Sequence, residues 1–275
     1  MRGLRRKKSG VSVMMPRFYL RKYLFKNSIM MAMFKKPVSE ATAKKEMTKE
    51  QKVIKKKLNL KEIITVDFPN DQYYREAYDK KQIVLHHTVS GQGVNGDIAW
   101  WRSTADHVAT AIIVGWDGKI YQLFGSKYWG HHLGCHTANN RDLNKASIGI
   151  EIDAWGGLVR TNRQWYPAKW DKKLKKHVAN TKVSPIQNVQ VYPNGFKGFY
   201  GFEKYTNAQI EAVRELLVYW SERYKIPLDY NEDMWSVSSD ALAGNEGVWT
   251  HVSFRKDKSD CHPQPELLEM LKSLK

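Results

Sequence analysis

The sequence predicts an α/β domain with a central mixed β-sheet flanked by helices. Short aliphatic runs at 83–85 and 148–152 have the length and the β-branched composition of buried strands. Residues 109–124 predict a β-hairpin around an Asp117-Gly118 turn. Residues 206–224 repeat apolar side chains on one helical face, which predicts an amphipathic helix packed on the sheet.

Two shorter helices complete the predicted elements. Residues 97–101 predict a short helix after the first strand, and residues 265–274 predict a last helix. The inward positions of the last helix are Leu267, Leu271 and Leu274. Thr206 and Gln209 form a capping-box pattern, so the long helix is expected to begin there.

The positive charge of the chain is concentrated in its first 60 residues. Residues 1–60 hold 18 Lys and Arg against three Glu, which accounts for most of the net charge of +17. We expect a basic extension that is disordered, or helical only at 46–60. The alternative is an arm that attaches to an anionic surface formed by wall polymers, nucleic acid or a membrane. Residues 61–275, rich in Trp and Tyr, are long enough to form one folded domain with a packed core.

An aromatic-rich insertion is expected at about 154–205. Prolines and a Pro193-Asn194-Gly195 turn interrupt it, and residues 189–192 predict one strand of a small hairpin. Its aromatic rings either pack in an ordinary core or form a wall that contacts a glycan.

The sequence predicts neither a signal peptide nor a membrane span. Arg and Lys interrupt every apolar run of the N-terminal segment, and none reaches the length needed to cross a bilayer. We therefore expect synthesis in the cytoplasm. The two cysteines, Cys135 and Cys261, give no disulfide framework.

Three potential metal ligands stand at the ends of predicted strands and in a following loop. His86 ends the run 83–85, His251 follows the apolar residues 248–250, and a charged loop can bring Asp260 back toward His251. Two imidazoles and one carboxylate, with a fourth position open for water, are the ligand set of catalytic zinc. The alternative is that each His is a hydrogen-bonded structural residue.

Six ordered motifs make the chain resemble a known family. They are IVLHHTVS, DGKIYQLF, YWGHHLG, SIGIEID, YTNAQIEAV and TH(x6)KSD, and they cover roughly residues 80 to 275. In this order they resemble the zinc-dependent N-acetylmuramoyl-L-alanine amidases, a family that includes phage lysins and is related to peptidoglycan recognition proteins. The resemblance implies that residues 61–275 are a zinc amidase catalytic domain.

The resemblance also implies roles for individual residues of the cluster. His86, His251 and Asp260 match the zinc ligands, and Cys261 is the alternative third ligand because relatives also use Cys there. Glu151 matches the acid that handles the proton of the attacking water, unless it is only a surface carboxylate. Lys258 matches the cation that stabilises the oxyanion. Residues expected to bind the peptide are Trp129, His132 and Asn144.

One position departs from the family pattern. Relatives commonly carry a His or Tyr where this chain has Ala111, so a substrate contact made there is absent or comes from elsewhere, with His107 as a candidate.

The function implied is hydrolysis of the amide between N-acetylmuramic acid and L-Ala of peptidoglycan, with Zn²⁺ as cofactor, on the bacterial cell wall, in a phage-type lysin. The alternative is a recognition protein of the same fold that binds muropeptides without cutting them. A nucleic-acid partner is not expected, because residues 61–275 hold 27 Lys and Arg against 25 Asp and Glu and are nearly neutral.

Overall fold

The computed structural model describes residues 63–104 and 106–274. The basic extension 1–60, with the helix expected at 46–60, lies outside the described residues.

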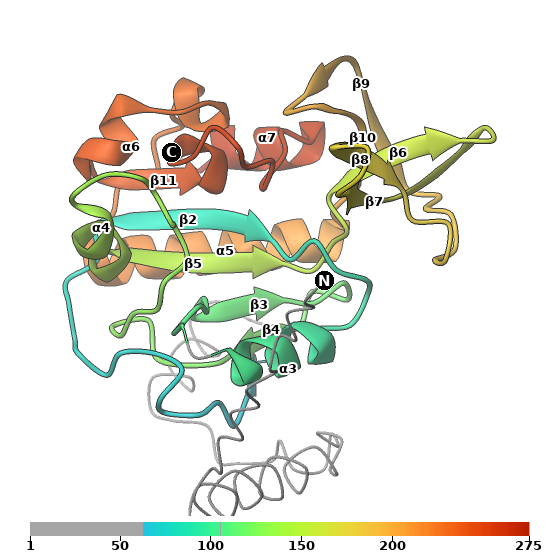
Figure 1. Ribbon diagram of the computed structural model, residues 1–275. Helices are drawn as coiled ribbons and strands as arrows, with labels where there is room; N and C mark the ends of the chain where they lie inside the picture. Colours follow the sequence, from blue (N-terminus) through green and yellow to red (C-terminus); the bar gives the residue numbers. More distant parts are fainter. Residues whose placement is uncertain (1–62, 105, 275) are drawn as a thin grey trace, which may run out of the picture. The chain divides into compact units, whose positions relative to one another are not determined.

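A six-stranded mixed sheet is the centre of this part of the chain (Figure 1). Its strand order is β1-β4-β3-β5-β2-β11. The strands are β1 (Ile63–Thr65), β2 (Gln82–His87), β3 (Ile112–Val114), β4 (Ile120–Gln122), β5 (Ser147–Ile152) and β11 (Gly247–Thr250). Neighbours are parallel except β3 and β4, which form the predicted hairpin. The predicted fold class is confirmed.

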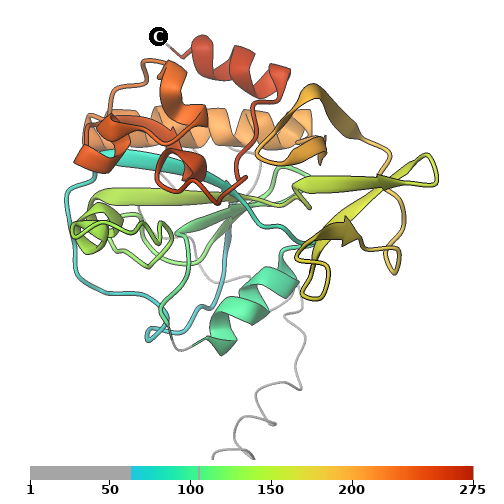
Figure 2. The same ribbon diagram turned by 45° about the horizontal axis from the view of Figure 1, so that its top comes forward.

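The central strands are apolar because both faces of the sheet are covered. β2 is buried at all six positions, as expected for a parallel strand between helices. The helices are α3 (Asn95–Ser103), α4 (Asn140–Ala146), α5 (Asn207–Tyr224), α6 (Ser239–Ala243) and α7 (Pro265–Lys272), with two 3-10 turns, η2 (Glu232–Trp235) and η3 (His251–Ser253). In Figures 1 and 2, α5 and α3 lie on opposite sides of the sheet.

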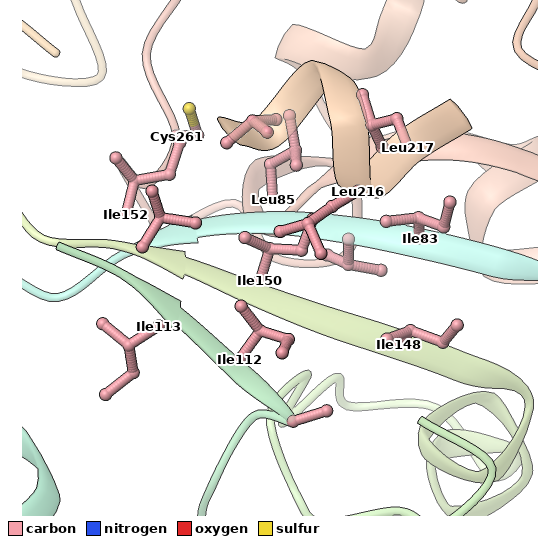
Figure 3. Packing of buried hydrophobic residues seen from close by; sticks show 14 of the residues in the cluster. Ile83, Leu85, Ile112, Ile113, Ile148, Ile150, Ile152, Leu216, Leu217 and Cys261 are labelled. Carbon is pink, nitrogen blue, oxygen red and sulfur yellow. The ribbon is translucent and has the colours of Figure 1, made fainter. Parts of the chain in front are cut away.

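Helix α5 covers one face of the sheet, and its start is fixed by the predicted capping box. Thr206 Oγ1 accepts a hydrogen bond from the backbone N–H of Gln209, whose side chain accepts one from the backbone N–H of Thr206. Leu216 and Leu217 of α5 pack toward β2 and β5 (Figure 3). Gly118 in the β3–β4 turn lies so close to α5 that a Cβ there would be 2.7 Å from the carbonyl oxygen of Ala208.

The insertion forms a second sheet. Five antiparallel strands in the order β8-β7-β6-β10-β9 lie to one side of the central sheet (Figures 1 and 2). They are β6 (Gly157–Thr161), β7 (Gln164–Asp171), β8 (Lys176–Ala179), β9 (Val189–Phe196) and β10 (Phe199–Glu203). The strand predicted at 189–192 is part of β9 and pairs with the next strand, β10, as a hairpin. The turn expected at Pro193 is not found, because Pro193 lies within β9, an edge strand of the second sheet, where proline is tolerated.

Over the described residues, no helix combines the length and the apolar character needed to cross a membrane.

Candidate metal and active site

The register of two parallel strands brings two distant histidines together. Leu85 of β2 pairs with Thr250 of β11, so the next residues along each strand, His86 and His251, emerge side by side at the same sheet edge. On the other side of β2, His86 pairs with Glu151 of β5. Register partners in neighbouring strands point to the same face of a sheet, so Glu151 faces the same space as His86. His87 points to the opposite face, where Nδ1 lies 2.8 Å from the hydroxyl of Tyr205.

The three expected ligands converge on one point. His86 Nδ1 lies 3.0 Å from His251 Nδ1, and Asp260 Oδ2 lies 3.2 Å from the first and 2.8 Å from the second. All three residues are buried. In a tetrahedral zinc site with bonds of about 2.0–2.1 Å, ligand atoms lie roughly 3.3 Å apart. The observed triangle is close to this size.

The hydrogen bonds of the other ring nitrogens fix the tautomers. His251 Nε2 donates to the carbonyl oxygen of Leu133 at 2.8 Å, which leaves a lone pair on Nδ1. His86 Nε2 lies 3.0 Å from His132 Nδ1, and His132 Nε2 lies 2.9 Å from Ser147 Oγ, whose hydroxyl donates to the carbonyl of Leu143. Because the Ser147 hydroxyl donates its proton to Leu143, it accepts from His132 Nε2, and His132 Nδ1 then accepts from His86 Nε2. His86 Nδ1 therefore also carries a lone pair.

The cluster therefore has the chemistry of a cation site. Two imidazole lone pairs and one carboxylate face one another about 3 Å apart, an arrangement that is repulsive unless a positive charge lies between them. Burial lowers the pKa of His86 to about 4, so this imidazole is neutral near pH 7, as a metal ligand must be. The residues present thus fit a zinc ion, although iron, cobalt or nickel accept similar ligands.

The carboxyl group of Asp260 is suited to ligation as well. Burial alone raises its pKa, but attraction to His251 and the contacts of Oδ2 with His251 and His86 outweigh burial and hold the pKa well below its ordinary value. An ionised carboxylate is the form that binds a metal.

The thiol of Cys261 is directed away from the histidine pair. Its Sγ lies 3.1 Å from the hydroxyl of Tyr205, and the side chain belongs to the same buried hydrophobic cluster as Ile152 (Figure 3). Burial raises the pKa of this thiol to about 12, which disfavours the thiolate that metals bind. The geometry therefore favours Asp260 over Cys261 as the third ligand.

The cluster opens into a cavity of about 500 Å³. Glu151 and Lys258 line it together with the three cluster residues. Burial raises the pKa of Glu151 well above its ordinary value, the nearby Asp260 charge adds to the effect, and Lys258 opposes it. Within the described part of the chain, Glu151 Oε2 is buried without a hydrogen-bond partner, so a group able to exchange a proton faces the cavity.

The residues expected to bind the peptide differ in position. His132 lines the cavity, but its ring also holds His86. Trp129 is 1% exposed and stacks on Tyr74 with ring centroids 3.9 Å apart. Asn144 is fully buried, and its Oδ1 accepts hydrogen bonds from the backbone of His132 and Leu133. Trp129 and Asn144 therefore support the 129–133 segment and do not line the cavity.

The departure at Ala111 is not compensated by His107. Ala111 is buried, and the His107 ring lies against Tyr74 at 4.5 Å instead of lining the cavity.

Helix α3 supplies part of the cavity wall that the sequence analysis did not assign. Asp97 and Trp100 line the cavity, and Trp100 is 58% exposed. Burial raises the pKa of Asp97 to about 6, although a hydrogen bond from Ser90 works against this. The sequence feature that could have pointed to this wall is the pair Trp100-Trp101, in a short predicted helix soon after the strand that carries His86.

The family model described as N-acetylmuramoyl-L-alanine amidase matches residues 76–264. A comparison with curated proteins finds no match. The matched range includes every residue of the cluster and both Glu151 and Lys258.

Several solved structures are similar to the chain. N-acetylmuramoyl-L-alanine amidase LysC from Clostridium intestinale URNW shares 13% identity at a TM-score of 0.39, over 76% of this chain and 94% of that chain. Hydrolase AmiA from Staphylococcus aureus, in complex with its ligand, shares 14% identity at 0.43, over 84% and 92%. A mutant endolysin from Bacillus subtilis shares 17% identity at 0.41, over 77% and 95%.

Proposed function

The chain belongs to the N-acetylmuramoyl-L-alanine amidase family, and from this premise we propose that it is a zinc-dependent peptidoglycan hydrolase. The bond cut is the amide between the lactyl group of N-acetylmuramic acid and L-Ala of the stem peptide. The observation that carries the proposal is the convergence of His86 Nδ1, His251 Nδ1 and Asp260 Oδ2 beside a cavity lined by Glu151 and Lys258.

Five residues that line the cavity have a defined role in this proposal. His86, His251 and Asp260 hold the metal, and bound zinc supplies Lewis-acid activation of the water and of the scissile carbonyl. Glu151 takes a proton from the attacking water and returns it to the leaving amine of L-Ala. A carboxyl whose pKa burial has raised is suited to both transfers. Lys258 places a positive charge near the oxygen that becomes negative.

Substrate contacts in the proposal follow the positions of the side chains. His132 contacts the peptide at the cavity wall, and Trp100 adds an exposed aromatic surface on the α3 side. Trp129 and Asn144 act indirectly, because they hold the segment that carries His132.

The test is digestion of purified peptidoglycan sacculi, followed by mass spectrometry of the soluble products. We expect stem peptides with free L-Ala amino ends and no new reducing sugar ends. Glu151→Gln should lower the rate about 10²–10⁴-fold, as for loss of a general base, while one zinc per chain is retained. New reducing ends would identify a glycosidase instead. Tight binding of sacculi without any product from the zinc-loaded wild type would identify a recognition protein.

A role in cell-wall lysis, as in a phage-type lysin, is the setting we propose for this activity. Its support is the family match together with an accessible cavity at the cluster. Expression in bacteria whose inner membrane is then permeabilised should lyse the culture, and the Glu151→Gln variant expressed at the same level should not. Intact cells with active enzyme inside would contradict this setting.

A further inference from the structure

The second sheet contains a cavity of its own. It measures about 710 Å³, and all of its wall comes from residues 159–200. None of these residues lines the cavity at His86. Its wall includes Arg160, Trp165, Trp170, Lys176, His177 and Tyr200.

Large aromatic side chains in this wall are exposed to solvent. Trp170 is 56% exposed and Tyr200 is 62% exposed, whereas Phe202 of the same sheet is fully buried and forms the core. Contiguous exposed aromatic surface on a folded domain commonly marks a binding site. The flat face of an aromatic ring packs on the C–H face of a sugar ring, so a saccharide is one class of ligand that fits.

Two tryptophan rings of this wall, those of Trp165 and Trp170, are held in place before any ligand arrives. Trp170 pairs with His177 across β7 and β8, with an edge contact at 5.1 Å between ring centroids. Arg160 pairs with Trp165 across β6 and β7, with its guanidinium 5.7 Å from the ring centroid. Trp165 lies over Gly201, where a Cβ would come within 2.6 Å of the indole ring. Rings fixed in this way lose little conformational entropy on binding.

The charge of this sheet is strongly positive. Residues 157–203 carry nine Lys and Arg against only Asp171 and Glu203, whereas the rest of residues 61–275 carry 18 Lys and Arg against 23 Asp and Glu. Glu203 is buried and accepts a hydrogen bond from the backbone of Trp155, so it does not offset the exposed cations. The ligand of this cavity is therefore expected to be an anion.

We propose that this cavity binds the glycan strand of peptidoglycan from which stem peptides have been removed. The inference rests on the proposed function, because hydrolysis of the lactyl–L-Ala amide leaves a free carboxylate on each N-acetylmuramic acid. Every turnover thus adds a negative charge to the sugar chain beside the enzyme. Trp170 and Tyr200 stack on sugar rings, and Arg160 and Lys176 pair with the new carboxylates. The second sheet then keeps the enzyme on strands that it has already begun to process.

The test measures the binding of supplied stem-free glycan strands, so it does not require the chain to cut anything. We expect binding that weakens with salt. Neutral N-acetylglucosamine oligomers, which lack the carboxylate, should bind at least ten-fold more weakly. The double variant Trp170→Ala, Lys176→Gln should lose at least ten-fold in affinity for the stem-free strands. Its matched control changes an exposed Trp and an exposed Lys outside the second sheet, Trp116→Ala with Lys225→Gln, and should bind as the wild type does.

Activity on a short soluble muropeptide separates this inference from the proposed function. The double variant should cleave such a substrate at the wild-type rate and unfold at the wild-type temperature, because both side chains are on the surface. Unchanged glycan affinity in the double variant would overturn the inference, and so would equal affinity for neutral oligomers. Tighter binding of single-stranded oligothymidylate than of the glycan would assign the cavity to nucleic acid instead.

Discussion

The ring of His132 links the His86–His251–Asp260 cluster to strand β5. One nitrogen contacts His86 and the other contacts Ser147, which sits at the first position of β5. A ring held on both sides cannot rotate freely, and it fixes the orientation of the His86 imidazole. Partners of this kind raise the affinity of a metal site without touching the ion.

Replacement of His132 by Ala should weaken zinc binding. The His86 imidazole loses its hydrogen-bond acceptor, and we expect zinc affinity to fall roughly 10–100-fold, measured by competition with a chromogenic chelator. His132→Asn should restore part of the affinity, since the amide oxygen can accept from His86. His131→Ala is the control, because His131 contacts Tyr74 rather than a cluster residue. Equal affinities in all four proteins would show that His132 does not position the ligand.

The third ligand can be identified with two single variants. Asp260→Ala should reduce the zinc content of the purified protein from about one ion per chain to nearly none, because two imidazoles alone hold the ion weakly. Cys261→Ala should retain the ion, with a loss of stability of about 1 kcal/mol from the buried thiol. Metal analysis after dialysis gives the answer. Loss of zinc in Cys261→Ala and retention in Asp260→Ala would reverse the assignment.

The two histidines of the cluster could be predicted from the sequence because each lies at the end of a buried strand or directly after it, whereas Asp260 lies in a loop. A histidine at the end of a buried strand has a fixed place in a sheet, and the motif order then related His86 to His251 across 165 positions. The positions of Trp129 and Asn144 could not be predicted in the same way. Whether a loop side chain faces a cavity or the loop's own backbone depends on tertiary contacts, here with Tyr74 and with the amides of residues 132 and 133.

At the scale of elements, Lys80, which lies two residues before β2, links three separate segments of the chain. It is 2% exposed, and its ammonium donates to the carbonyl oxygens of Tyr128, Lys145 and Ser147. These atoms belong to the loop before Trp129, the end of α4 and the start of β5. Burial lowers the pKa of Lys80 to about 7, so the charge is costly to keep there and these contacts compensate for its burial.

The Lys80→Met variant should be markedly less stable. Three carbonyl oxygens, that of Ser147 buried and those of Tyr128 and Lys145 partly buried, lose a donor. We expect the free energy of unfolding to fall by about 2–4 kcal/mol, measured by urea denaturation. The neighbouring Lys81 is exposed, so Lys81→Met should change it by less than about 0.5 kcal/mol. A loss of similar size in both variants would mean that the hydrophobic substitution itself, and not the buried contacts, is responsible.

Helices and central strands were easier to predict than the second sheet. The apolar repeat and capping box of α5 and the aliphatic runs of β2 and β5 are local signals, and each was confirmed. Among strands β6 to β10, only β9 was predicted, through residues 189–192. Their alternation is blurred by aromatic residues on both faces and by Pro167 and Pro193 inside strands. The pairing of five strands depends on side-chain contacts between different strands, and these cannot be predicted from the sequence of one segment.

At the scale of the whole molecule, the buried carboxyl group of Glu203 makes the free energy of unfolding depend on pH. Glu203 is 3% exposed, and burial raises its pKa to about 7, while the hydrogen bond from Trp155 works against this. The folded state therefore holds this proton more tightly than the unfolded chain does. The stabilisation is fully present below pH 4.5, the ordinary pKa of Glu, and is lost as the pH rises toward 7.

Glu203→Gln should remove this dependence. The amide keeps the acceptor for Trp155 but cannot ionise, so the variant should gain stability relative to the wild type between pH 4 and pH 8, on the order of 2 kcal/mol. Urea denaturation at several pH values measures this. Glu246 is exposed, and Glu246→Gln should follow the wild-type curve. Parallel curves for Glu203→Gln and the wild type would show that Glu203 titrates normally.

The second sheet begins and ends at the same place. Gly157 pairs with Phe202, and the backbone N–H of Glu203 donates to the carbonyl oxygen of Gly156 at 3.0 Å. The excursion is nevertheless anchored to the rest of the domain, because the Tyr192 hydroxyl lies 2.8 Å from His262 Nδ1 and the Phe202 ring stacks on the His262 ring at 4.6 Å between centroids. A graft that replaces the second sheet must therefore supply new partners for His262, which stands two residues after Asp260, or the loop that carries this carboxylate loses its support.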